Sequence, residues 1–379
     1  MRPVLFVTGH APAYRVGALA RLHEREQLEL ALFGGRMTHG GAGAPAQLPF
    51  PHRHVRPGEL FSLAASGRYR AVVCPTGGRL APLAAWAGAR RARVPLILWA
   101  SLWAHPRTPA HALTYLPLRR LYRSADAVVT YGPHVSAYVR AGGARNVHVA
   151  PQSVDNDFWR APAGAPRCAG WPAEASVRFL FVGRPAPEKG LELLLAAWRQ
   201  ASLRAPDAAL VIAGVGDDAA PRAHDRGGTP LTAERAPVAT APAGRAQVIR
   251  LGKLAPEQLR GVYAACHVLV VPSLATRTFR EPWGLVVNEA MNQRLAVIAS
   301  DAVGAAAGGL VRDGENGLIV PAGDAHTLAR ALTRVAGDAA LRSRMAAAGA
   351  GDVLAFDHDA WAEGFSRALF SVGATRVRW

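Results

Sequence analysis

The sequence predicts an α/β protein built from two domains, each with a parallel β-sheet between layers of helices. The chain has 379 residues, which is more than a single hydrophobic core usually supports. Short runs that are apolar throughout alternate with amphipathic stretches, and they do so in two sets along the chain. Continuous apolar runs are typical of strands that are buried on both faces, as in a parallel sheet.

The first domain is expected over residues 1–160. Its predicted strands are the apolar runs PVLFVTG, LELALFGG, YRAVVCPTGG, VPLILWAS and ADAVVTYG, and its first helix is the amphipathic stretch YRVGALARLHE. Residues 161–176 are rich in Pro, Ala and Gly and have no periodicity, so we expect a linker there.

The second domain is expected over residues 177–355. Its apolar runs are VRFLFVGR, AALVIAGVG, AQVIRLG, the end of LRGVYAACHVLVVPS, LAVIASD and NGLIVPAGD. The segment from Asp217 to Ala246 has little pattern and is expected to be a mobile loop. Residues 356–379 are expected to form a helix that returns to the first domain.

The composition favours a cytoplasmic protein with an unevenly distributed charge. No signal peptide or membrane-spanning run is visible, and three scattered cysteines indicate reduced thiols. Residues 1–150 carry 19 Arg against 5 Asp and Glu, whereas the other 229 residues carry 25 Lys and Arg against 22 Asp and Glu. The basic half would attract a polyanion or an anionic lipid surface. A GC-rich genome that favours Arg is an equally open explanation of the arginines.

A basic pair follows the first strand of the second domain, in the stretch FVGRPAPEKGLELLLAAW. Arg184 and Lys189 flank a turn after Gly183, and a helix is expected to begin near Pro187 or Glu188. Backbone N–H groups at a helix start lack partners, so cations beside them make a site for phosphate groups. The chain has only two lysines, which suggests that a compact charge is needed in this turn. The alternative is a solvated pair in an ordinary loop.

Two glutamates stand eight positions apart in REPWGLVVNEAM. Glu281 precedes a proline and is expected in a loop, while Glu289 should lie one turn inside a helix that begins at Gly284 or Leu285. In this geometry the helix start faces a diphosphate, and the two carboxylates accept hydrogen bonds from hydroxyl groups on either side of it.

These residues resemble a known family. The stretches EPWGLVVNEAM, LAVIASDAVGA, DGENGLIVPAGD and VGRPAPEKG are similar to glycosyltransferase family four, whose members have the GT-B fold, in which two Rossmann-like domains face each other across a cleft. The resemblance implies retaining, metal-independent transfer of a hexose-type sugar from a nucleotide-diphosphate sugar. It implies that Glu281 orients the donor sugar and that Glu289 holds the ribose. Arg184 and Lys189 would stabilise the leaving diphosphate. The other expected contacts of the nucleotide sugar are Gly183, Gly252, Gly284 and Leu285.

The first half resembles the acceptor domain of bacterial members that build surface polysaccharides, so a glycan or lipid-linked acceptor is expected. His105 is a candidate active-site residue, and His10, after the first strand, is a second candidate. The stretch from Tyr115 to Arg123 would form a basic amphipathic helix on the inner membrane face, or else the core face of an ordinary helix with solvated arginines. Residues 292–296 and Gly308 to Gly309 depart from the usual family pattern, so sugar selection could differ.

Several other interpretations are weaker. Gly214, Gly216 and Ala219, with Glu234 downstream, fit a dinucleotide fingerprint, but Pro221 interrupts the helix that it needs. Asp155 and Asp157 resemble a metal-binding D-x-D motif but match a turn of the family. A glycoside hydrolase has no use for a phosphate-binding turn, and a nucleic-acid binder would need a reading module that is not seen. A nucleotide-sugar epimerase or a degenerate scaffold with the same fold stays open as the alternative to a transferase.

Overall fold

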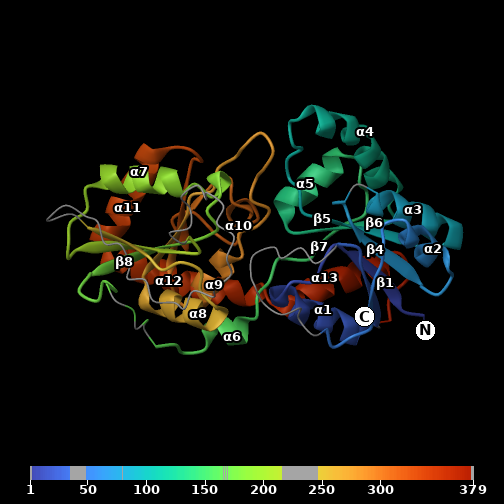
Figure 1. Cartoon of the computed structure of the whole chain (residues 1–379), viewed down its shortest axis with the longest axis horizontal. Coiled ribbons are helices and arrows are strands. Elements are labelled where there is room, and N and C mark those ends of the chain that lie inside the picture. Colours follow the sequence, from blue (N-terminus) through green and yellow to red (C-terminus); the bar gives the residue numbers. More distant parts are fainter. Residues whose placement is uncertain are drawn as a thin grey trace, which may run out of the picture. The chain divides into compact units, whose positions relative to one another are not determined.

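The computed structural model describes residues 2–34, 48–78, 80–164, 166, 168, 170–215 and 246–376. The chain forms two compact units (Figure 1). Unit 1 comprises Met1–Asn156, Arg277–Trp283 and Leu354–Trp379, and unit 2 comprises Asp157–Thr276 and Gly284–Val353. The predicted loop of residues 217–246, except its last residue, lies outside the described residues, as do three members of the dinucleotide fingerprint, Gly216, Ala219 and Glu234.

Unit 1 contains a parallel sheet of seven described strands. In spatial order they are β3 (His52–His54), β2 (Leu28–Leu32), β1 (Val4–Thr8), β4 (Ala71–Pro75), β5 (Leu96–Ala100), β6 (Ala127–Thr130) and β7 (Val147–Val149). Val4 of β1 pairs with Leu28 on one side and with Ala71 on the other. The chain therefore winds outward from β1 in both directions, and the order reverses between β1 and β4. In such a sheet, ligands bind at the carboxyl ends of the strands near this point.

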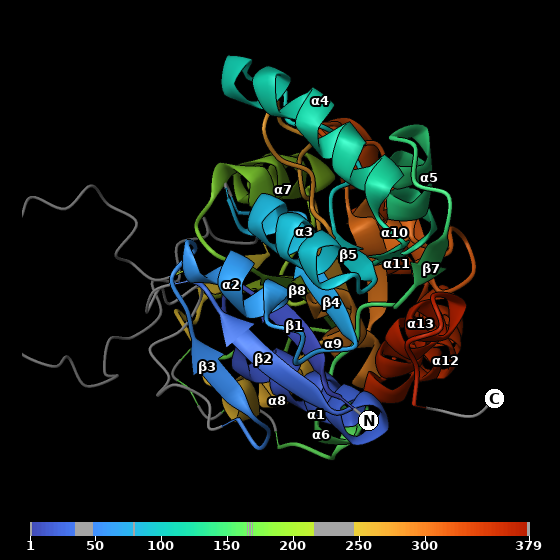
Figure 2. The same cartoon turned by 90° about the vertical axis from the view of Figure 1, so that its right-hand side faces the viewer.

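Helices cover both faces of this sheet. They are α1 (Ala13–Glu26), α2 (Glu59–Ala65), α3 (Ala81–Ala92), α4 (Pro109–Ser124), α5 (Pro133–Ala141) and α13 (His358–Ser371). One core contains Leu19 and Leu22 of α1 with Trp361 and Phe365 of α13. The other core lies on the opposite face of the sheet and buries Leu60 of α2 together with apolar side chains of α3. Figure 2 shows α2 and α3 in front of the strands of this sheet. Because residues of both faces are buried, the five predicted strands are largely apolar. The two outer strands were not predicted, since β3 (HRH) is exposed and β7 (VHV) is only partly buried.

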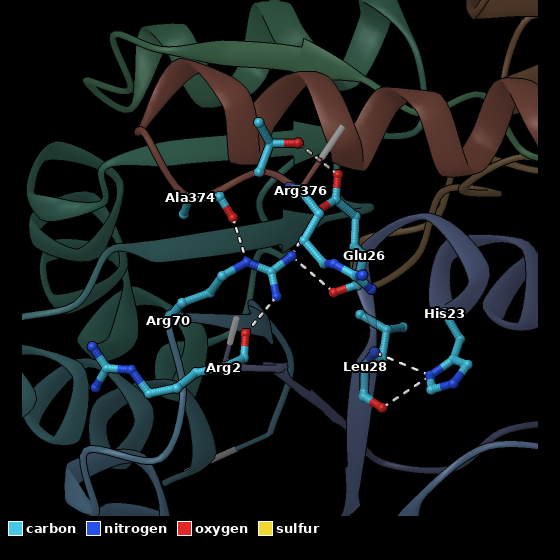
Figure 3. Close-up of polar contacts among 8 residues, drawn as sticks. Arg2, His23, Glu26, Leu28, Arg70, Ala374 and Arg376 are labelled. Carbon is cyan, nitrogen blue, oxygen red and sulfur yellow. Dashed lines mark hydrogen bonds and ion pairs between the residues drawn. The ribbon is translucent and has the colours of Figure 1, made fainter. Parts of the chain in front are cut away.

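A buried ion pair joins three distant parts of unit 1 (Figure 3). Arg70 Nη2 donates to Glu26 Oε2 at 2.6 Å, and Arg70 Nε donates to the carbonyl oxygen of Ala374, also at 2.6 Å. The Glu26 carboxylate also accepts hydrogen bonds from the Thr375 hydroxyl at 2.8 Å and from the Arg376 backbone N–H at 2.9 Å. The pair thus ties the chain after α13 to the end of α1.

Unit 2 contains a parallel sheet of six described strands. In spatial order they are β10 (Gln247–Arg250), β9 (Ala208–Ala213), β8 (Val177–Val182), β11 (Val268–Val271), β12 (Ala296–Ser300) and β13 (Gly317–Val320). Here the order reverses between β8 and β11, because β8 pairs with β9 on one side and with β11 on the other. The prediction of an α/β protein with two parallel sheets is confirmed.

The described helices of unit 2 surround its sheet. They are α6 (Asn156–Arg160), η1 (Pro187–Lys189), α7 (Leu191–Ala201), α8 (Pro256–Ala265), α9 (Val286–Asn292), α10 (Gly304–Ala307), α11 (Ala325–Gly337) and α12 (Ala339–Asp352). The short 3-10 turn η3 (Val353–Ala355) follows where the chain passes from unit 2 to unit 1. Asp324 and Asp338 cap α11 and α12 through hydrogen bonds from backbone N–H groups of the first turn. Leu194 of α7 and Leu328 of α11 pack in one core with Phe179 of β8.

Candidate functional site

The turn after β8 and the chain after β11 lie side by side at the carboxyl edge of the unit 2 sheet. The backbone N–H of Leu274 donates to the carbonyl oxygen of Glu188 at 2.8 Å. Gly190 has a φ of +72°, and a Cβ on it would stand 2.0 Å from the carbonyl oxygen of Pro272. Only glycine fits both conditions. The two strand ends at the reversal of strand order are therefore in direct contact, which is where a doubly wound sheet binds ligands.

Three glycines continue this edge along the ends of β8, β9 and β10. The backbone N–H of Gly214 donates to the carbonyl oxygen of Gly252 at 2.6 Å. A Cβ on Gly214 would stand 2.5 Å from the carbonyl oxygen of Gly183. Two residues predicted to contact the nucleotide sugar, Gly183 and Gly252, thus lie on either side of Gly214, and we call these three residues the glycine strip.

The basic pair lies on the turn after β8, but the helix begins later than expected. Pro187 and Glu188 form the short 3-10 turn η1, and α7 starts only after Gly190, whose left-handed conformation separates the two. The predicted helix start at Pro187 or Glu188 is therefore wrong. The Arg184 side chain is 61% exposed, and its Nη2 lies 3.6 Å from a carboxylate oxygen of Glu188, whereas Lys189 is half-buried. Arg184 is thus free of tight packing and only loosely paired, so it can turn toward a bound phosphate.

Glu289 lies in the first turn of α9 and accepts a hydrogen bond from the Tyr263 hydroxyl at 2.8 Å. Burial raises the pKa of Glu289 to about 7, although the bond from Tyr263 acts in the opposite direction. Burial and the nearby Glu289 carboxylate raise the pKa of Tyr263 well above its usual value. The Trp159 ring packs edge-on against Tyr263. Tyr263 contacts the candidate residue Glu289, and sequence reasoning did not single it out because it lies on α8 in an otherwise ordinary helical pattern.

The start of α9 differs slightly from the prediction. The helix begins at Val286, one residue after Leu285 and two after Gly284, which were the predicted starts, and Gly284 has a φ of +91°. The Val287 backbone N–H donates to the carbonyl oxygen of Gly284 at 3.0 Å. Gly284 and Leu285 therefore form the turn that leads into the helix.

Glu281 belongs to a segment that packs within unit 1. Its side chain is 7% exposed, and its backbone carbonyl accepts a hydrogen bond from Trp103 Nε1 at 3.1 Å. His134 hydrogen bonds through Nε2 to the carbonyl oxygen of Pro282 at 3.2 Å, and its ring packs on Trp283. The two glutamates thus belong to different units: Glu281 lies in a loop of unit 1, and Glu289 lies on helix α9 of unit 2.

Unit 1 has a cavity of 380 Å³ at the carboxyl ends of its strands, where the strand order reverses. Its lining comes from the ends of β1, β4, β5 and β6 and from the start of α1. His10 is among the lining residues and His105 is not. His105 instead hydrogen bonds through Nδ1 to the Tyr138 hydroxyl at 3.2 Å and through Nε2 to the carbonyl oxygen of His111 at 2.8 Å. His105 therefore holds the start of α4 in place, and its predicted role in the active site stays a prediction.

The basic stretch at α4 has two parts. Leu121 and Tyr122 are buried in the core of unit 1, as the ordinary interpretation requires. The residues from His111 to Pro117 are all exposed, and among them Leu113 is 81% and Leu116 is 66% exposed. The first half of α4 thus presents apolar side chains to solvent beside the basic second half.

A larger hollow of 670 Å³ lies elsewhere in unit 2, between β13, α11 and the end of α7. Its lining includes Asp313, His326 and Arg330. None of its lining residues belongs to the turn after β8, so we do not assign the nucleotide-sugar site there. In the described residues no helix is both long and apolar enough to cross a membrane.

The two parallel-sheet units have the GT-B fold, as a comparison with solved structures shows. HepE from Anabaena, solved with UDP and glucose, matches 98% of this chain over its own full length, with a TM-score of 0.68 and 17% identity. Sucrose-phosphate synthase from Thermosynechococcus elongatus matches 99% of this chain over its own full length, with a TM-score of 0.66 and 20% identity. At these identities the likeness shows the fold alone.

Sequence similarity to a known family covers the second half of the chain. Residues 172–352 match the family described as glycosyl transferases group 1. The phosphatidyl-myo-inositol mannosyltransferase of Mycobacterium leprae is 34% identical over 196 residues, which are 52% of this chain and 46% of the relative. The D-inositol 3-phosphate glycosyltransferase of Corynebacterium diphtheriae is 34% identical over 186 residues, 48% of this chain and 39% of the relative. This chain thus spans less than half the length of these two relatives. The family resemblance predicted from the sequence is confirmed.

Proposed function

We propose that the protein is a retaining, metal-independent glycosyltransferase that moves a hexose-type sugar from a nucleotide-diphosphate sugar to a glycan or lipid-linked acceptor in cell-surface polysaccharide synthesis. The observation that carries the proposal is the strand-end turn of unit 2. There Arg184 and Lys189 lie at the reversal of strand order, and the glycine strip continues from it along the ends of β8, β9 and β10. This part of the chain matches glycosyl transferases group 1. The solved HepE complexes with UDP and with UDP-glucose support a nucleotide-sugar donor.

The chemistry needs charge stabilisation at the leaving group. In the proposed reaction, the bond between the sugar C1 and the diphosphate oxygen breaks while the acceptor oxygen bonds to C1 on the same face. The acceptor proton passes to the departing diphosphate. Without a metal, the negative charge that grows on the diphosphate must be stabilised by cations and backbone N–H groups, and Arg184 and Lys189 supply the cations.

The remaining roles follow from position and residue type. Glu289 would accept hydrogen bonds from the ribose hydroxyls, and Glu281 would orient hydroxyls of the donor sugar. Gly183, Gly252, Gly284 and Leu285 would present backbone groups to the nucleotide sugar. Gly183 follows β8, Gly252 follows β10, and Gly284 and Leu285 precede α9.

The direct test is a panel of nucleotide sugars measured for thermal stabilisation of the full chain, because a true donor binds the folded state and raises its melting temperature. Transfer is then measured with the stabilising donor. Glu281→Ala should abolish transfer and leave the stabilisation by the nucleotide sugar largely intact. Full transfer by this variant would remove the proposed role of Glu281.

Turnover of the nucleotide sugar alone into an epimer, with no acceptor, would favour the epimerase alternative. Unchanged transfer in EDTA is expected for a metal-independent enzyme.

We also propose that α4 contacts the inner face of an anionic membrane, where a lipid-linked acceptor would be presented. The exposed Leu113 and Leu116 beside the arginines of α4 support this. Flotation with anionic liposomes should occur and should weaken as salt is raised. The double change Leu113→Ser and Leu116→Ser should reduce it, while Leu354→Ser, at another exposed leucine, should not. Equal flotation with neutral liposomes would contradict the proposal.

A further inference from the structure

Glu281 lies in a short segment of unit 1 that is flanked on both sides by residues of unit 2. The segment is Arg277–Trp283, and the residues before and after it, Thr276 and Gly284, belong to unit 2. It contains none of the described helices and strands, so a regular ladder of backbone hydrogen bonds does not fix its shape. Its contacts with the rest of unit 1 therefore decide where Glu281 lies.

Two ring N–H groups of unit 1 hold the backbone at Glu281. Trp103 Nε1 donates to the carbonyl oxygen of Glu281 at 3.1 Å. His134 Nε2 lies 3.2 Å from the carbonyl oxygen of Pro282. Because a carbonyl oxygen only accepts, His134 Nε2 must carry the proton of this hydrogen bond. Two consecutive carbonyl groups of the segment are thus each bound by a side chain of unit 1.

The environment of His134 favours this donor form. Burial lowers the pKa of His134, while the hydrogen bond to Pro282 acts in the opposite direction. The ring is therefore neutral at pH 7 and carries one proton on its two nitrogens. Nδ1 is buried and has no hydrogen-bond partner, so a proton there would have no acceptor. The proton is thus more stable on Nε2, where it meets the Pro282 carbonyl.

The rings of the two donors also pack against the segment on either side of Glu281. The rings of Trp103 and His134 lie edge to face, with their centroids 5.1 Å apart. On the preceding side, the guanidinium carbon of Arg280 lies 4.9 Å from the Trp103 ring centroid. On the following side, Trp283 is 3% exposed, and its ring centroid lies 6.0 Å from that of His134. Both neighbours of Glu281 in the segment are therefore tied to the same two rings.

We propose that Trp103 and His134 are positioning residues of the transfer reaction, which fix the backbone around Glu281 so that its carboxylate meets the donor sugar. The proposal rests on the proposed function, in which Glu281 orients hydroxyls of that sugar. Neither ring needs to touch the reacting atoms, because each acts through the segment. A misplacement of about 1 Å can slow a reaction roughly a hundred-fold, so release of the segment should slow transfer.

The first experiment measures kcat for transfer and, separately, affinity for the nucleoside diphosphate of the stabilising donor. Trp103→Phe keeps a ring and removes the N–H, and His134→Leu removes the other donor. Each should lower kcat by about ten-fold or more. Affinity for the nucleoside diphosphate should be unchanged, because this ligand lacks the sugar that Glu281 orients. Normal kcat in both variants would overturn the proposal, as would losses of affinity as large as the losses of kcat.

Matched variants separate the hydrogen bonds from general packing. His134→Gln offers an amide N–H at a reach similar to that of Nε2, so it should restore most of the kcat that His134→Leu loses. Trp86→Phe, on α3, removes an N–H that is buried and has no hydrogen-bond partner, and it should leave kcat unchanged. Equal losses in His134→Gln and His134→Leu, or in Trp103→Phe and Trp86→Phe, would contradict the proposal. If Trp103→Phe does not fold, the two His134 variants decide the question.

Hydrogen exchange tests the same contacts without turnover. Backbone amides of residues 277–283 in the full chain should exchange faster in Trp103→Phe and His134→Leu than in the unchanged protein or in Trp86→Phe. Unaltered exchange in both variants would count against the proposal. If the unchanged protein and both variants transfer sugar at equal rates, the proposed function holds and this inference alone fails. If the unchanged protein transfers no sugar from any nucleotide sugar, the proposed function fails, and the role of the two rings fails with it.

Discussion

At the scale of single residues, the chemistry depends on a few side chains whose environment differs from water. Glu289 is the clearest example, because burial raises the pKa of its carboxyl to about 7 while Tyr263 donates a hydrogen bond to it. The ionised form accepts hydrogen bonds at both oxygens, whereas the protonated form must also donate one. The sequence predicts Glu289 as a candidate site residue, but it could not indicate the raised pKa of this group, since that depends on burial beside α8.

The pKa of Glu289 predicts how donor affinity depends on pH. Affinity for the nucleotide sugar should rise as pH increases through about 7, because Glu289 then ionises. Tyr263→Phe removes the hydrogen bond that lowers this pKa, so the midpoint should move to higher pH. Glu289→Gln should bind the donor more weakly and without this transition. Titrations of the stabilising nucleotide sugar from pH 5.5 to 8.5 would test it, and a transition that persists in Glu289→Gln would assign it to another group.

The same group predicts a pH dependence of stability. A carboxyl with a raised pKa in the folded state contributes stability that is fully present below its unfolded value of about 4.5 and is lost as pH rises through about 7. The free energy of unfolding of the unchanged protein, relative to Glu289→Gln, should therefore fall over this interval. Urea unfolding of both proteins across this range is the measurement. A difference that rises with pH would contradict the raised pKa.

The buried pair of Glu26 and Arg70 makes a prediction about stability alone. Arg70→Met leaves the Glu26 carboxylate, which is 0% exposed, without its cation and should lower the free energy of unfolding by about 3 to 5 kcal/mol. Arg68→Met is the control, since its side chain is 58% exposed and lies 3.6 Å from Glu29, and it should cost less than about 1 kcal/mol. Chemical denaturation of both variants would measure the difference. Equal losses would show that burial of the pair is not what matters.

At the scale of elements, strands were easier to predict than helix starts. Apolar runs such as VRFLFVGR identify buried strands from local sequence alone. Helix starts depend on backbone geometry: α7 begins after Gly190 because that residue is in the left-handed region and lies against Pro272, more than 80 residues further along the chain. No local sequence pattern indicates that two residues so far apart in the chain will lie in contact. His105 was likewise chosen by its place after a strand, while its hydrogen bonds to Tyr138 and His111 depend on the packing of α4 and α5.

The contact between Gly190 and Pro272 predicts how the turn after β8 responds to a methyl group. Gly190→Ala must move one strand end away from the other, so it should lower stability and also weaken nucleotide-sugar binding. Gly323→Ala is a matched control, because Gly323 has a φ of +87° but open space around it. It should cost only the strain of a left-handed residue, about 1 to 2 kcal/mol, with no effect on binding. If both variants bind the donor normally, the turn does not need this close contact.

At the scale of the whole molecule, the order of strands explains why the candidate sites lie where they do. Both sheets reverse their order next to their first strand, and each has its candidate site at the carboxyl edge there: the basic turn in unit 2 and the cavity in unit 1. The sequence predicted the unit 2 site because Arg184 and Lys189 are close together in the chain. For the unit 1 cavity the sequence indicated only His10, because the other lining residues come from distant strand ends and meet only in the folded domain.

The central claim is that the turn after β8 holds the diphosphate of a nucleotide sugar. Calorimetric titration of the stabilising nucleotide sugar into folded Lys189→Met and Arg184→Met tests it most directly. Arg330→Met, at an exposed position of α11, is the control for charge. We predict that affinity falls ten-fold or more in Lys189→Met, falls in Arg184→Met and is unchanged in Arg330→Met. Binding that is equally strong in all three variants, or the absence of binding by any nucleotide sugar to the unchanged protein, would contradict the claim.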